Sequence, residues 1–82
     1  MKDLLRFQVN PNPVPANGCF TLIFPPLHFP ADMYQITDEE GRLIRRGRIT
    51  ERDRELALSS GGMQDGVYWI IVGENRERFT IL

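Results

Sequence analysis

Few residues of this 82-residue chain have the side chains needed for catalysis or metal binding. The chain contains one histidine, His28, and one cysteine, Cys19. A catalytic triad needs a nucleophile, a base and an orienting acid, and no such partners stand near His28 in the sequence. Zinc sites need several cysteines and histidines at motif spacing. We therefore expect no catalytic, cofactor-binding or metal-binding residues, and we expect that the protein is not an enzyme.

Cys19 lies in a strand-like run and has no cationic neighbour in the sequence that would activate its thiol. A single cysteine cannot form an intrachain disulfide. Free cysteines are among the most buried residue types. The sequence therefore predicts that Cys19 is a small buried residue of a strand.

Two clusters of charge stand close together in the middle of the chain. The acids Asp38, Glu39 and Glu40 lack the alternating oxygen ligands of a calcium-binding loop, so we interpret them as a solvated hairpin tip. The arginines that follow have no aromatic residues among them, which argues against a single-stranded nucleic-acid platform; they are Arg42, Arg45, Arg46 and Arg48. The net charge of −1 also gives no reason to expect nucleic acid. We interpret the arginines as a hydrated sheet face, with a contact to another protein as the alternative.

The pattern of hydrophobic residues predicts strands and no helices. Short alternating runs with β-branched and aromatic residues are typical of a half-buried pleated surface. These runs cover residues 4–9, 18–24, 33–37, 42–49, 55–58, 67–72 and 76–82. About seven short strands with turn signals between them predict one all-β domain, an immunoglobulin-like antiparallel β-sandwich over residues 1–82.

The same pattern predicts details of the packing. Residues 10–17 form a stiff, extended connection, because each proline fixes its own backbone and extends its predecessor. The proline-rich segment 25–32 carries the chain from one sheet to the other, and residues 59–62 form a flexible turn. Gly47 indicates a bulge or close packing within its strand. The nearly unbroken apolar run 67–72 predicts a central strand that is covered on both faces. Alternation predicts a buried face for Leu5, Phe7 and Val9 and inward positions for Leu56 and Leu58. It also groups residues by face: Phe20, Leu22 and Phe24 share one face of their strand, Cys19, Thr21 and Ile23 share the other, and Phe79 and Ile81 share a face of the closing strand.

No signal-peptide pattern and no run of about 20 apolar residues occurs in the sequence. We therefore expect the chain to be a piece of a longer protein whose export signal lies elsewhere.

Several motifs occur in one order along the chain. Pro11-Asn12-Pro13 follows the first strand. Asp38, Gly41, Arg42 and Ile44 fit the hairpin pattern Asp-x-x-Gly-Arg/Lys-x-Val/Ile. Gly66, Tyr68, Ile70 and Val72 fit Leu-x-x-Gly-x-Tyr-x-Val/Ile-x-Val/Ile, with Met63 in place of the leucine, and a basic closing strand follows. This order resembles the C-terminal sorting domain of the type IX secretion system, also called the Por secretion system, of Bacteroidetes.

The resemblance implies a secretion signal with no chemistry of its own. Such a domain directs a protease or adhesin cargo, fused before it in the precursor, across the outer membrane. The implied partners are the outer-membrane translocon and the sortase that normally removes the domain. The implied location is the periplasm and outer membrane in transit, and the cell surface or medium afterwards. The residues expected to carry recognition are Gly66, Tyr68, Arg76, Arg78, Phe79, Thr80, Ile81 and Leu82, and the structural motif residues are Pro11, Asn12, Pro13, Asp38, Gly41 and Arg42.

The closing strand, residues 76–82, suggests how recognition would work. If this strand lies at a sheet edge, its free backbone groups can pair with a strand of the receptor. The same edge can exchange between two copies and give a strand-swapped homodimer.

A second hypothesis is an accessory adhesion or carbohydrate-binding β-sandwich of a secreted enzyme. Most of the aromatic residues are expected in the core, but alternation places Trp69 on the face opposite to Tyr68. Trp69 is therefore the aromatic residue that could contact a sugar.

Overall fold

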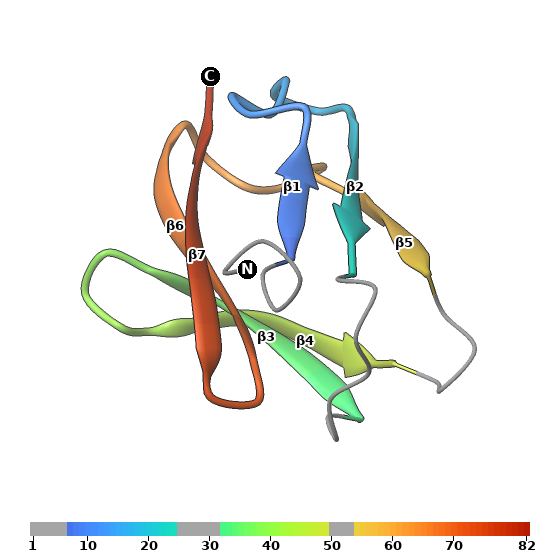
Figure 1. Cartoon of the computed structure of the whole chain (residues 1–82). Helices are drawn as coiled ribbons and strands as arrows, with labels where there is room; N and C mark the ends of the chain where they lie inside the picture. The colour runs from blue at the N-terminus through green and yellow to red at the C-terminus, as the bar shows by residue number, and fades with distance from the viewer. Residues whose placement is uncertain (1–6, 25–31, 50–53) are drawn as a thin grey trace.

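The computed structural model describes residues 7–24, 32–49 and 54–82 and folds them into seven strands (Figure 1). The strands are β1 (Gln8–Asn10), β2 (Cys19–Ile23), β3 (Met33–Asp38), β4 (Leu43–Arg48), β5 (Glu55–Ser59), β6 (Gly66–Val72) and β7 (Asn75–Ile81). The described residues contain no helix. Each predicted strand is present with ends shifted by a few residues, and residues 4–6 of the first prediction lie outside the described ranges.

The strands form two antiparallel sheets. One has three strands in the order β1-β2-β5, and the other has four in the order β4-β3-β6-β7. This confirms the predicted all-β sandwich. In constant-type immunoglobulin domains the fourth strand joins the sheet of the first two. Here β4 pairs with β3 instead, so the sheet that holds the closing strand is the larger one. The change of sheet between β2 and β3 agrees with the crossing predicted for residues 25–32.

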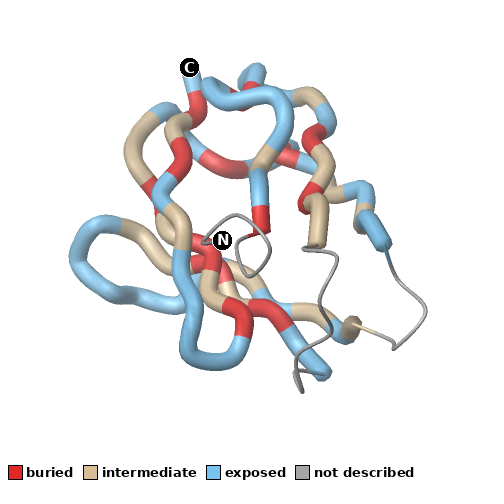
Figure 2. Tube along the Cα trace, viewed as in Figure 1, coloured by how far each residue is buried: buried red, intermediate tan, exposed pale blue. Residues whose placement is uncertain are grey.

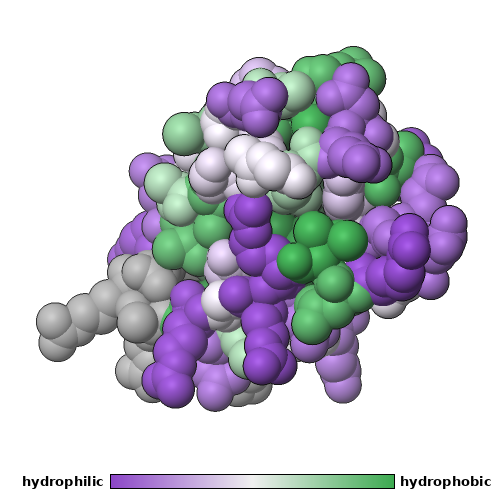
Figure 3. Space-filling model, turned by 180° about the vertical axis from the view of Figure 1, so that it is seen from behind, coloured by the Kyte–Doolittle hydropathy of each residue, from purple (hydrophilic) through white to green (hydrophobic). Residues whose placement is uncertain are grey.

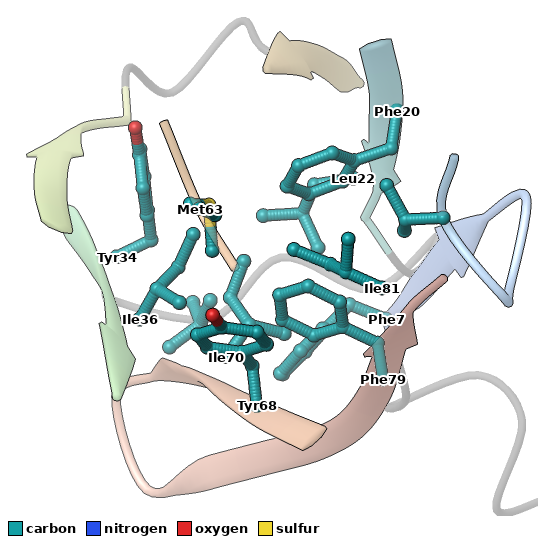
Figure 4. Close-up of a cluster of buried hydrophobic side chains, with 12 residues drawn as sticks. Phe7, Phe20, Leu22, Tyr34, Ile36, Met63, Tyr68, Ile70, Phe79 and Ile81 are labelled. Carbon is teal, nitrogen blue, oxygen red and sulfur yellow. The ribbon is translucent and has the colours of Figure 1, made fainter. Parts of the chain in front are cut away.

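The core lies between the two sheets, where alternate side chains of each strand point inward (Figures 2 and 4). Phe20 from β2 contacts Phe79 from β7, with ring centroids 5.4 Å apart, and this pair ties one sheet to the other. The buried hydrophobic residues are Phe7, Val14, Phe20, Leu22, Tyr34, Ile36, Met63, Tyr68, Ile70, Val72, Phe79 and Ile81. Val9, Leu56 and Leu58, predicted to point inward, and Phe24 are partly buried against this cluster.

β6 is central in its sheet, between β3 and β7, as its apolar sequence predicts. Its inward residues are buried, whereas Val67, Trp69 and Ile71 on the other face are only half-buried. The prediction of cover on both faces was therefore only half correct. The outer residues are shielded by cross-strand side chains of β3 and β7 and by no described element above them.

The two predictions for Cys19 and Gly47 have different outcomes. Cys19 is exposed, so its predicted burial was wrong. Phe20 and Leu22 take the inward positions of β2, and alternation turns Cys19 to the solvent. Gly47 shows the predicted close packing, because the ring of Tyr34 lies against it across the β3–β4 pair. The bulge of this pair lies further along, at Ile36 and Thr37.

Residues 10–17, predicted to be a stiff, extended connection, contact β7 and the residue that follows β5. This segment contains two cis peptide bonds, before Pro11 and before Pro13, and Val14 is fully buried. Ser60 anchors it, although residues 59–62 were predicted to be flexible. The buried Ser60 hydroxyl accepts from the N–H of Gly18 (2.8 Å) and donates to the carbonyl of Pro15 (2.7 Å).

Candidate recognition surface

The closing strand β7 presents two different faces. Phe79 and Ile81 are buried, and Phe79 stacks on Tyr68 with ring centroids 5.7 Å apart. Alternation turns the side chains of Arg76, Arg78 and Thr80 to the outer face of the four-stranded sheet. Phe79 and Ile81 can therefore affect partner binding only by stabilising the fold. Arg76, Arg78 and Thr80 can contact a partner directly.

The outer edge of β7 is closed by the Pro-Asn-Pro turn. The side chain of Asn12 accepts from the N–H of Thr80 (3.2 Å) and donates to the carbonyl of Arg78 (3.4 Å). Val14 then pairs in parallel with this strand, donating to Thr80 (2.7 Å) and accepting from the N–H of Leu82 (3.0 Å). The N–H of Ala16 adds a bond to the carbonyl of Leu82 (3.0 Å).

These bonds change one expectation. β7 is an edge strand of its sheet, which meets the condition for strand addition, but its edge is not free between Arg78 and Leu82. Backbone pairing of a receptor strand with this part of β7 would first have to displace residues 12–16. Leu82 nevertheless keeps an accessible side chain, which is 65% exposed.

The Gly-x-Tyr motif forms a tyrosine corner at the start of β6. The hydroxyl of Tyr68 donates to the carbonyl of Gln64, four residues earlier, at 2.6 Å. Such a bond from a tyrosine near the start of the sixth strand is a feature of immunoglobulin-like sandwiches. Met63 is buried in the core, and Gly66 has φ 151°, which side chains rarely adopt. The motif residues Met63, Gly66 and Tyr68 thus have a structural role in this fold.

The Asp-x-x-Gly-Arg motif forms the predicted hairpin tip between β3 and β4. Asp38 accepts from the backbone N–H groups of Glu40 and Arg42 (both 2.9 Å), and its other oxygen pairs with Nε of Arg42 at 2.8 Å. The backbone bond from Arg42 is the main cause that lowers the pKa of Asp38 below its ordinary value, and the Arg42 guanidinium adds to this. Gly41 takes φ 83°, the positive value that closes the turn.

A shallow groove of about 400 Å³ brings the hairpin tip and the tyrosine corner together. Asp38 and Arg42 line it from the hairpin, and Gly66 and Tyr68 line it from the start of β6. The groove is open and its rim is acidic, through Asp38, Glu39, Glu40 and Asp65. No group of three potential ligands among the described residues is arranged to hold a metal ion.

The outer face of the four-stranded sheet carries arginines on both edge strands and the apolar residues Ile71 and Trp69 on the central strand β6. One row across the sheet runs Arg46, Gln35, Ile71 and Arg76, and the next runs Leu43, Thr37, Trp69 and Arg78. The guanidinium of Arg76 lies over the Trp69 ring, 4.6 Å from its centroid. This cation–π contact covers one face of the indole that a sugar ring would stack on.

Several predicted features do not reach this surface. Asp38, Gly41 and Arg42 belong to the β3–β4 hairpin, at the opposite edge of the sheet from β7 and the Pro-Asn-Pro turn, and His28 lies outside the described residues. Sequence reasoning missed Ser60 and Val14, which hold the turn in place; the only signal for Val14 is an apolar residue between two prolines. The described ranges contain no helix that could cross a membrane.

The sequence was compared with protein-family models and with curated proteins. No protein-family model matches this chain, and no curated protein matches its sequence.

Proposed function

We propose that this chain is a C-terminal secretion signal of the type IX secretion system, which directs a fused cargo protein across the outer membrane. The observation that carries the proposal is the order of the motifs and the ordered element that each one forms. The Pro-Asn-Pro turn holds the closing strand, the Asp-x-x-Gly-Arg motif closes a hairpin, and the Gly-x-Tyr motif starts the central strand.

Within this proposal, the exposure of each side chain favours some of the expected residues as direct contacts of the translocon. A receptor that binds the folded domain can touch Arg76, Arg78, Thr80 and Leu82, whose side chains point outward. Tyr68, Phe79 and Ile81 support recognition indirectly, because they are buried and hold β6 and β7 in the core.

The test is secretion of a passive reporter. A periplasmic signal peptide, a reporter enzyme and this domain are fused in that order and expressed in a bacterium with a type IX system. We expect reporter activity on the cell surface or in the medium, and retention in the periplasm when the translocon gene is deleted. Retention of the reporter in both strains, with the domain folded, would refute the proposal.

The variants for this test are point substitutions on the outer face. Deleting residues 79–82 would also remove Phe79 and Ile81 from the core, so a loss of secretion would not separate recognition from folding. The partners in this proposal are the translocon, the sortase and the cargo domain, and the protein is exported.

A further inference from the structure

The four edge strands of the sandwich differ in how well they are covered. Residues 12–16 occupy the edge of β7, and β1 has only three residues. At β5, the guanidinium of Arg45 bonds to the carbonyls of Ser59 and Gly61. β4 has six residues and pairs only with β3 among the described elements. An edge of this length with unpaired backbone groups is a template for another strand.

The pairing register shows which backbone groups of β4 face outward. The N–H of Ile49 donates to the carbonyl of Asp32 at 2.9 Å, next to the pair of Met33 and Arg48. In an antiparallel ladder the hydrogen-bonded positions alternate, so Gly47 and Arg45 also bond to β3. The N–H and C=O groups of Arg46 and Arg48 therefore point to the open edge, two residues apart, as a fifth strand requires.

The side chains beside this edge are cationic and apolar. Arg46 and Arg48 are exposed, and neither forms an ion pair with another described residue. Three of the four exposed large hydrophobic residues of the described ranges lie on the same hairpin, namely Met33 (40%), Leu43 (52%) and Ile44 (43%). On the side of the molecule that faces away from β7, hydrophilic side chains surround a compact hydrophobic area (Figure 3).

The positive charges beside the β4 edge indicate which kind of strand can pair with it. A second copy that paired through its own β4 would set arginines against arginines, and like charges directly opposite one another destabilise a sheet. A strand with carboxylates at every second residue would instead place them beside Arg46 and Arg48, and those same residues would form the backbone bonds to Arg46 and Arg48. We propose that the β4 edge binds an extended acidic segment of another protein by β-strand addition. This inference does not rest on the sorting role, which concerns the opposite edge of the sheet.

The experiment titrates the ¹⁵N-labelled domain with a synthetic peptide of about ten residues that alternates glutamate with valine. We expect chemical-shift changes centred on β4 and slower hydrogen exchange at the amides of Arg46 and Arg48. The amides of Arg45 and Gly47, already bonded to β3, should show little change in exchange. The same peptide with lysine in place of glutamate should not bind.

Two controls separate strand addition from general charge attraction. A peptide N-methylated at its glutamates, the residues that would pair with Arg46 and Arg48, keeps its charge but cannot form the ladder, so it should not bind. The R46E/R48E variant should bind the acidic peptide about tenfold more weakly or worse. The R76E/R78E variant changes the same number of charges on the same face at the other edge and should bind as the wild type does.

Both variants alter exposed side chains, and a thermal melt confirms that each is folded. The proposal is overturned by no binding of the acidic peptide, by equal binding of the N-methylated peptide, or by equal losses in the two variants.

Discussion

Replacing Gly47 with alanine tests how tightly the larger sheet is packed. A Cβ at this position would lie 2.5 Å from Cε2 and 2.7 Å from Cζ of the Tyr34 ring, and 2.6 Å from its hydroxyl oxygen. Such distances are far inside van der Waals contact, so the ring must move. Tyr34 is 6% exposed and belongs to the core, so the ring has no empty space to enter.

The change in the free energy of unfolding caused by Gly47→Ala is the balance of two opposing effects. Forcing an extra methyl group into a packed core costs about 1–3 kcal/mol. Removing a glycine from a strand returns roughly 0.5–1 kcal/mol by restricting the unfolded chain. We therefore expect a net loss of about 1–2 kcal/mol in the free energy of unfolding. For a domain of this size that loss lowers Tm by about 4–16 °C.

The assay is thermal and urea unfolding, with a double-mutant cycle as its control. Tyr34→Phe keeps the ring carbons that clash, so Gly47→Ala should cost the same in that background. Tyr34→Leu removes them, so the cost should fall close to zero. The reasoning would be refuted if Gly47→Ala left Tm unchanged, or if its cost were equal in the phenylalanine and leucine backgrounds.

Three further substitutions test the contacts that hold the motifs in place. Ser60→Ala removes the side-chain bonds to the partly buried backbone groups of Gly18 and Pro15 and should cost about 1–3 kcal/mol in urea unfolding. Ser59→Ala at the exposed end of β5 should cost less than about 0.5 kcal/mol; equal losses would contradict the role of Ser60. Tyr68→Phe removes the bond to Gln64 and should cost about 1 kcal/mol, with an unchanged fold by circular dichroism; an unchanged Tm would contradict the tyrosine corner. The lowered pKa of Asp38 stabilises the folded state above the ordinary carboxyl pKa, and this contribution is lost as the pH falls through the lower, folded-state value. The stability difference between wild type and Asp38→Asn should therefore shrink on acidification, and a difference that grows at low pH would be contrary evidence.

The strands and turns could be predicted because their signals are local. Alternation within β2 grouped Phe20 with Leu22 on one face, and a glycine after three acids marked the hairpin at Gly41. The same alternation put Cys19 on the opposite face from Phe20, but the general habit of cysteines led to the wrong prediction that Cys19 is buried. Local patterns give the face of a residue more reliably than residue-type averages do.

The arrangement of the edges could not be predicted, because it depends on contacts between distant residues. Asn12 and Thr80 are 68 residues apart in the chain, and Ser60 and Pro15 are 45 apart. No periodicity signals such pairs, since each depends on strands that are distant in the sequence coming together in the fold. The sequence also does not show which sheet β4 joins, and therefore it does not show which strand edge is open.

The most direct measurement of the central claim compares secretion of two reporter fusions in a type IX-competent bacterium. One carries R76E/R78E on the outward face of β7, and the other carries R46E/R48E on β4, with both domains shown to be folded by their melting curves. If the domain is a sorting signal read on its closing strand, the first fusion accumulates in the periplasm while the second is secreted like the wild type. Secretion of the first fusion at the wild-type level would contradict that claim.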